Sequence, residues 1–291
     1  MHLTSGFFWF KVKDDPIWVE QVEKGGWRLS IYTCRPILAY CVAVAACLGA
    51  VMGSFLNCAA FRIVRGESFL KGRSRCPACG HELTARELVP VLSWVFQRGR
   101  CRACGAKVSA RYPLTELGFA LATVLCLLRF DLTVLCLRNY AFLCCLFLLT
   151  LTDLEDMTIP DGCHIASALA WLAALPFAFT GWGDVVRSLA AALIFGGGLL
   201  GISLVMDKVL GRDSLGGGDI KLFAVVGLYL GIIGTLFTLL IACVLGLMMN
   251  AALRRHDGDR VFPFGPAIAL SAALMLLYGD PLIQWYRGLL L

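Results

Sequence analysis

The chain has 291 residues, of which 59% are hydrophobic and 16% charged, and its mean hydropathy is +0.77. Soluble domains usually carry about a quarter charged residues, so this balance excludes an ordinary soluble protein and predicts a polytopic membrane protein. The net charge of +6 does not indicate a nucleic-acid partner, because excess Lys and Arg in a membrane protein mainly mark the cytoplasmic loops.

Residues 1–35 are predicted to form an N-terminal extension that lies on the membrane surface. They are rich in Phe and Trp, whose rings settle at the boundary between lipid and water. Charged residues interrupt the segment, so it lacks the continuous apolar core of a cleavable signal peptide.

Apolar runs along the rest of the chain predict an all-α fold with about eight transmembrane helices. The expected spans lie near 36–60, 113–130, 138–157, 161–180, 184–206, 219–233, 234–253 and 263–285. A helix needs roughly 20 residues to cross the hydrocarbon core, so 219–233 is short. The stretch 219–253 is either a hairpin or one broken segment, and Gly231 and Gly234 favour the hairpin. The expected domains are a first transmembrane helix at 36–61 and a helical core at 113–291.

Residues 62–112 are predicted to form a cytoplasmic loop domain between the first two spans. This loop holds 11 of the 26 Lys and Arg residues but only three acidic residues. Cytoplasmic loops carry such an excess of positive charge. Counting spans from this loop places the two aspartate-containing segments described below at the same face of the membrane.

Four of the 14 cysteines form two C-x-x-C pairs inside this loop. The pairs are Cys76-Pro-Ala-Cys79 and Cys101-Arg-Ala-Cys104, with 21 residues between them. A glycine follows each pair and predicts a tight turn of the backbone there. This spacing is close to that of a zinc ribbon, and a cytoplasmic loop is too reducing for disulfides. Four thiolates leave no open position for water, so we expect a structural zinc ion, with neighbouring His81 as a bystander. The other ten cysteines read as small buried hydrophobic residues.

Asp153 and Asp219 each lie at the boundary between an apolar segment and a polar one. A carboxylate beside lipid raises the free energy of the folded protein, so it is rarely found there without a function. Asp153 is expected at the end of a membrane helix, while Asp161 follows Pro160 and suits a cap for the next helix. Asp219 follows three glycines at a helix start. It reads either as an N-cap or, because the glycine run permits close backbone approach, as a functional carboxylate.

If Asp153 and Asp219 approach each other, they form an acid/base pair that shares one proton. The ionised member takes a proton from water, and the protonated member polarises a peptide carbonyl and later the leaving amine. Other catalytic signatures are absent from the sequence, including a Gly-x-Ser-x-Gly elbow, a zinc-protease His pair, a P-loop and a dinucleotide fingerprint.

The motifs in this order resemble a known family. Gly-x-Gly-Asp at 216–219, followed by Lys221 and Leu222, is similar to the GxGD intramembrane aspartyl proteases. Asp153 with Ile-Pro-Asp at 159–161 resembles the type IV prepilin leader peptidases, and the cysteine tetrad resembles their bifunctional peptidase/N-methyltransferase branch. Further similar stretches are Gly53 to Asn57 before Arg62, Val89 to Trp94, and Arg111 to Leu117.

The resemblance implies an enzyme of the bacterial inner membrane that acts at its cytoplasmic face. It would cleave the short basic leader from type IV prepilins and type II secretion pseudopilins, and then methylate the new N-terminal amine with S-adenosylmethionine. Asp153 and Asp219 match the catalytic aspartates of the family, and Cys76, Cys79, Cys101 and Cys104 match its metal-binding cysteines. The loop 62–112 would then be associated with methyl transfer.

No methyl-donor site can be read from the residues themselves. Gly53, Asn57, Arg62 and Glu116 are candidates through the resemblance alone. Each has a structural alternative: helix packing for Gly53 with Gly49, polar contacts between helices for Asn57, and interface anchoring for Arg62 and Glu116.

Two other functions fit the sequence. In a proton- or ion-coupled transporter, Asp153 and Asp219 would carry the ion, and the zinc loop would dock a partner. In an enzyme with methyltransferase activity alone, both aspartates would be helix caps.

Overall fold

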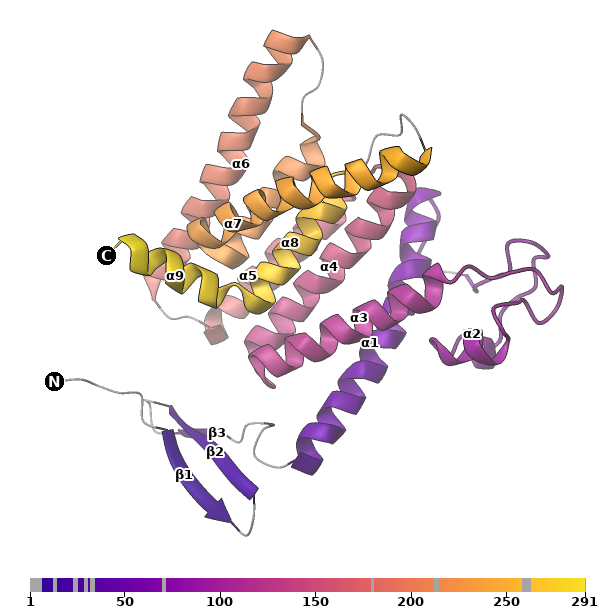
Figure 1. Cartoon of the computed structure of the whole chain (residues 1–291), viewed down its shortest axis with the longest axis horizontal. Helices are drawn as coiled ribbons and strands as arrows, with labels where there is room; N and C mark the ends of the chain where they lie inside the picture. The colour runs from indigo at the N-terminus through magenta and orange to yellow at the C-terminus, as the bar shows by residue number, and fades with distance from the viewer. Residues whose placement is uncertain are drawn as a thin grey trace. The chain divides into compact units, whose positions relative to one another are not determined.

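The computed structural model of the chain describes residues 7–12, 15–22, 26–28, 31, 35–69, 72–178, 181–211, 215–257 and 263–290. The chain divides into two compact units. The first comprises residues 1–54 with 84–137, and the second comprises residues 55–83 with 138–291. Figure 1 labels the helices and strands in chain order.

The first unit contains a small antiparallel sheet that the sequence did not lead us to predict. Its strands are β1 (Phe7–Val12), β2 (Asp15–Val22) and β3 (Gly26–Arg28), and β2 pairs with both others. The aromatic and β-branched residues that we assigned to a membrane-surface segment are also those that favour strands. Placement of this extension on the membrane stays a prediction, and residues 1–6, 13–14, 23–25, 29–30 and 32–34 lie outside the described residues.

Helices of the first unit pack closely because glycines line one contact. Helix α1 (Arg35–Val64) meets α3 (Arg111–Phe130) at Gly49 and Gly53. A Cβ at Gly49 would lie 2.5 Å from Thr123 Oγ1, and one at Gly53 would lie 3.1 Å from Phe119 Cβ. These contacts support helix packing, which was the structural alternative given for Gly53 with Gly49. The remaining elements of this unit are η2 (Ala85–Glu87), α2 (Leu92–Phe96) and the first turn of α4 (Val134–Asp156).

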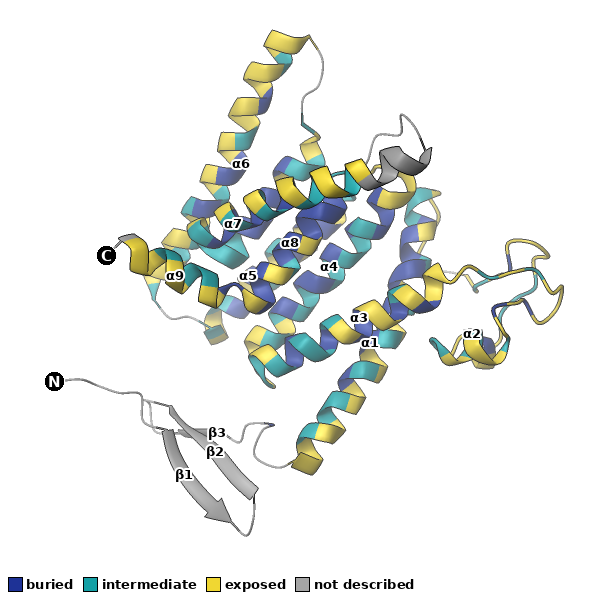
Figure 2. Cartoon of the chain, viewed as in Figure 1, coloured by how far each residue is buried: buried dark blue, intermediate teal, exposed yellow. Residues whose placement is uncertain are grey.

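The second unit is a helical bundle in which α7 touches most of its neighbours. Its helices are the end of α1 from residue 55, the rest of α4, α5 (Asp161–Ala178), α6 (Trp182–Leu210), α7 (Gly217–Asp257), α8 (Gly265–Tyr278) and α9 (Asp280–Leu290). Helix α7 packs against α5, α6 and α8, and Tyr229 of α7 stacks on Phe142 of α4. Figure 2 shows buried residues gathered on α4 and α8, whereas the C-terminal end of α6 is largely exposed.

The chain is a multi-pass membrane protein. Six helices of the described chain are long and apolar enough to cross a membrane, namely α1, α3, α4, α5, α6 and α7, and the bent pair α8–α9 would make seven. The all-α membrane fold is thus confirmed from residue 35 onward, and the ends of α3, α4, α5 and α6 fall within about four residues of the expected spans. We expected eight spans because we counted the residues of α7 as two transmembrane helices, at 219–233 and 234–253.

The break expected within α7 occurs at Gly231. This residue has φ +65° and ψ −172°, outside the helical region, so two helical segments meet there. A positive φ costs glycine nothing, which explains why the break falls at this residue.

The last expected span, 263–285, is not one straight helix. It bends by 79° between α8 and α9. Pro281 follows the bend and lacks the N–H that a continuing helix would need. The 14 residues of α8 measure about 21 Å, less than the roughly 30 Å of the hydrocarbon core. Helix α8 therefore does not cross the membrane by itself.

Close packing of α6 against α7 gives a testable prediction. A Cβ at Gly227 of α7 would lie 2.7 Å from the backbone nitrogen of Ala192 in α6. Because a helix backbone cannot move aside easily, Gly227→Ala should destabilise the protein by about 1–3 kcal/mol. Gly197→Ala is the matched control, since nothing lies within 4 Å of its added Cβ. Denaturation midpoints of the two variants in detergent measure the difference, and equal midpoints would contradict the packing.

Candidate active site and cysteine cluster

Each of the two C-x-x-C segments folds into a tight turn, and the two turns have the same hydrogen bonds. Cys76 N–H donates to His81 O at 2.9 Å, and Gly80 N–H donates back to Cys76 O at 2.9 Å. The second segment repeats both bonds between Cys101, Ala106 and Gly105, at 2.8 and 2.9 Å. Gly80 and Gly105 both have φ +72°, a conformation that glycine adopts without strain. The turn predicted from the glycine after each pair is confirmed.

The four cysteine sulfurs form a cluster that can bind a metal ion. The Sγ atoms of Cys76, Cys79, Cys101 and Cys104 all lie within 4.8 Å of one another. Tetrahedral zinc, with Zn–S bonds of about 2.3 Å, requires sulfurs about 3.8 Å apart, so these residues fit such an ion. Cys76 and Cys101 are buried, while Cys79 and Cys104 are exposed. His81 contributes its backbone carbonyl to the first turn, and its role as a bystander to the metal stays a prediction.

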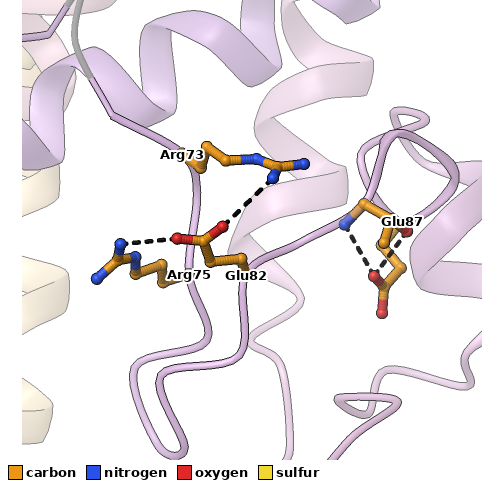
Figure 3. A network of polar contacts seen from close by, with 5 residues as sticks. Arg73, Arg75, Glu82 and Glu87 are labelled. Carbon is orange, nitrogen blue, oxygen red and sulfur yellow. Dashed lines mark hydrogen bonds and ion pairs between the residues drawn. The ribbon is translucent and has the colours of Figure 1, made fainter.

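Charged side chains brace the first turn. Glu82 accepts hydrogen bonds from Arg75 at 2.7 Å and from Arg73 at 3.3 Å (Figure 3). These residues lie on either side of the Cys76–Cys79 segment, where Arg75 and Glu82 also form an isolated β-bridge. Because the three side chains are 41–67% exposed, the ion pairs stabilise the turn weakly.

Asp153 lies in the last turn of α4 and is buried, with 5% of its surface exposed. The helix ends three residues later, where Met157 takes a positive φ of 52° and its N–H donates to Asp153 O. The Asp153 carboxylate accepts a hydrogen bond from Gly265 N–H at 3.0 Å. Gly265 is the first residue of α8. A position at the end of a membrane helix was predicted, but the partner was not.

Asp219 lies in the first turn of α7, which begins at Gly217. Its N–H donates to Gly216 O at 3.1 Å, so Asp219 is already inside the helix and is not its N-cap. Its side chain is half-buried. Gly218 permits a close approach, because a Cβ there would lie 2.9 Å from Ile159 Cβ. The glycine run thus brings α7 against another segment, as expected.

Ile159 connects the surroundings of the two aspartates. Its side chain contacts the Gly218 position next to Asp219, and its Cδ1 lies 3.3 Å from the Cβ that Gly265 lacks. Gly265 in turn holds Asp153. The two carboxylates are close enough for the charge of Asp153 to act on Asp219. The structure therefore brings these residues together from different helices of one unit.

Asp161 begins the helix that follows Pro160, and its expected role as a cap stays a prediction. It is the first residue of α5, and its carboxylate pairs with Lys221 Nζ of α7 at 2.7 Å. Both side chains are more than half exposed. The pair connects the starts of α5 and α7 beside the Asp219 turn.

The four residues suggested for the methyl donor already have contacts within the protein. Gly53 packs on α3, and Glu116 accepts Val91 N–H at 2.7 Å. Arg62 donates to the carbonyl oxygens of Ser68 and Phe69, at 3.5 Å each. Asn57 is 8% exposed. Glu116 is 7% exposed, so it holds the Val91 backbone and does not anchor the helix at the interface.

The sequence did not lead us to predict that Gly265 would contact Asp153, or that Ile159 would lie beside both Gly218 and Gly265. A glycine followed by a proline at the start of an apolar helix was a readable signal for a helix N-terminus. It did not indicate that the first N–H of this helix would face Asp153, because that contact joins positions 112 residues apart.

Comparison with known proteins agrees with this arrangement. Residues 47–130 match the bacterial peptidase A24 N-terminal domain, and residues 140–250 match the type IV leader peptidase family. No solved structure matches the chain significantly.

Bacterial relatives that match most of the chain carry the name prepilin leader peptidase/N-methyltransferase. One from Bacillus subtilis (strain 168) is 33% identical over 243 residues, which are 82% of this chain and 94% of the relative. One from Aeromonas hydrophila is 36% identical over 74% of each chain, and one from Pseudomonas putida is 30% identical over 83% of this chain and 92% of its own length. None of these findings supports a transporter. The chain belongs to the type IV leader peptidase family.

Proposed function

We propose that this protein is a membrane-embedded aspartyl endopeptidase that removes the basic leader from type IV prepilins and type II secretion pseudopilins, and then methylates the new N-terminal amine. The observation that carries the peptidase activity is the approach of Asp153 and Asp219 from separate helices of one bundle. Membership of the leader peptidase family and the names of the relatives support the choice of substrate and the second activity.

Peptide hydrolysis then needs only these two side chains and one water molecule. Two nearby carboxylates that are largely removed from water do not readily both ionise, so they share one proton. The ionised carboxylate takes a proton from the water as it attacks the scissile carbonyl. The protonated carboxylate donates to the carbonyl oxygen, and a proton then passes to the leaving amine. A new carboxylate on the leader and a free amine on the mature pilin result.

The four-cysteine cluster would hold a structural zinc ion. Zinc prefers four tetrahedral thiolates, and a site closed in this way holds a loop together without binding a reactive water. Cys76, Cys79, Cys101 and Cys104 would be its ligands. The metal takes no part in the hydrolysis.

Methyl transfer would use S-adenosylmethionine, which supplies an electrophilic methyl group when bound. The amine must be freed by cleavage before it can be methylated, so hydrolysis comes first. Gly53 and Glu116 already hold the fold together through α3 and Val91. We therefore assign neither of them to the methyl donor.

We place the active site at the cytoplasmic face of the bacterial inner membrane. The basic loop 62–112 supports this orientation, since positively charged loops stay on the cytoplasmic side. The expected partners are prepilin or pseudopilin substrates and membrane lipid, with no nucleic acid.

Purified protein in liposomes, incubated with a prepilin in the presence and absence of S-adenosylmethionine, tests the whole proposal. Mass spectrometry should detect the free leader in both reactions and a methylated mature pilin only with the methyl donor. A methylated product obtained only from pre-cleaved pilin would indicate a methyltransferase alone. The absence of any peptide product, together with uptake driven by an ion gradient, would indicate a transporter.

A further inference from the structure

We infer that Gly265 is a positioning residue that fixes Asp153 as the ionised member of the pair, so that Asp153 is the general base and Asp219 carries the shared proton. This inference rests on the proposed peptidase function. It adds a residue from α8 to a site that the sequence motifs place on α4 and α7 alone.

The two aspartates have different hydrogen-bond surroundings. Asp153 is buried, and its carboxylate accepts the N–H of Gly265 at 3.0 Å. In the described chain, no hydrogen bond reaches the carboxylate of Asp219. A backbone N–H that donates to a carboxyl group favours its charged form, and burial without a donor favours the neutral form.

The position of Gly265 strengthens this difference. It is the first residue of a 14-residue helix, α8, and the first N–H groups of a helix have no partner within it. The N-terminal end of a helix also carries a partial positive charge, which attracts an anion. Asp153 therefore satisfies a free donor of α8, and α8 stabilises the negative charge of Asp153.

Glycine is required at this position. A Cβ at Gly265 would lie 2.5 Å from Asp153 Oδ2 and 3.3 Å from Ile159 Cδ1. Any larger residue would displace the carboxylate or the start of α8. The absence of a side chain thus allows the backbone to reach Asp153 directly.

The first test compares two glycines with similar crowding. Gly265→Ala should lower kcat for leader cleavage by roughly 10²-fold, the loss expected from a displacement of about 1 Å at a reacting group, with little change in KM. Gly196→Ala is the control, because its Cβ would lie 2.7 Å from Ala224 Cβ, a contact between α6 and α7 that involves no carboxylate. Equal kcat values for the two variants would overturn the inference.

A double variant separates the carboxylate contact from simple crowding. Ile159→Val removes the Cδ1 atom that a Cβ at Gly265 would meet at 3.3 Å, but it leaves the Asp153 contact unchanged. Activity of Gly265→Ala should therefore not recover when Ile159→Val is added. Recovery would mean that Gly265 serves only to pack against Ile159.

The hydrogen bond itself can be observed without activity. The dipeptide Phe-Gly occurs in the sequence only at 195–196 and 264–265. Labelling with ¹³C-carbonyl Phe and ¹⁵N-Gly therefore gives two amide correlations, and Gly196→Ala assigns them. Asp153→Asn should shift the Gly265 amide proton upfield, because a charged acceptor is lost, and by more than Asp219→Asn does. An equal or smaller shift with Asp153→Asn would overturn the inference, whether or not the protein cleaves prepilins.

Discussion

Cys76→Ser should lower the bound zinc from one ion per chain to a trace. A serine hydroxyl does not ionise as a thiolate does, so the variant keeps only three of its four ligands. Because even changes outside the ligand set cost 10–100-fold in metal affinity, we expect a loss of at least about 100-fold. Metal analysis of the purified protein measures this directly. Cys243→Ser is the control, since Cys243 is an exposed residue of α7 outside the cluster.

Loss of the metal should also open the loop around the cluster. The ion pairs of Glu82 beside the first turn are largely exposed, so they add little to the stability that the metal gives. The Arg and Lys residues of 62–112 should then be cut faster by trypsin in Cys76→Ser than in Cys243→Ser. Unchanged zinc content, or equal rates of cutting, would contradict a metal-stabilised loop.

Asp153→Asn and Asp219→Asn should each reduce leader cleavage by at least about 10³-fold, which is within the range for loss of a general acid or base. Asparagine keeps the shape of the side chain but cannot exchange a proton. Each variant should still enter the membrane and elute as the wild-type protein does. The measurement is the initial rate of leader release from a prepilin, followed by mass spectrometry.

Asp156→Asn is the matched control for these variants. Asp156 belongs to the same last turn of α4 as Asp153, but it is exposed whereas Asp153 is buried. It should cleave prepilin at nearly the wild-type rate. If Asp153→Asn or Asp219→Asn also cleaved at that rate, the pair would not be the catalytic centre.

Much of the fold followed from the sequence because membrane helices are set by local composition. Long apolar runs predicted α1 and α3 to α6 to within about four residues. The cysteine turns followed in the same way, because C-x-x-C-Gly is a local pattern. The sheet β1–β3 was missed, since its aromatic residues suit both a strand and a membrane surface. The 79° bend before Pro281 was missed because hydropathy alone does not register it.

The candidate site was predictable in its residues but not in its contacts. Asp153 and Asp219 could be identified because a carboxylate at the edge of an apolar segment is energetically unfavourable. The glycines before Asp219 indicated a close approach of the backbone to another segment. The contact of Gly218 with Ile159 and the hydrogen bond from Gly265 to Asp153 depend on tertiary packing. No local pattern specifies which helix end will meet a carboxylate 112 residues away.

The most direct test of the catalytic pair compares the affinities of two non-cleavable prepilin peptides. One carries a tetrahedral carbon with a hydroxyl group at the scissile position, and the other is the same peptide without the hydroxyl. The wild-type protein should prefer the hydroxyl peptide by at least about 10²-fold, as enzymes do for transition-state analogues. Both Asp153→Asn and Asp219→Asn should lose most of this preference, because both side chains would bind that one hydroxyl. A preference that persists in either variant would show that the two aspartates do not act on the same atom.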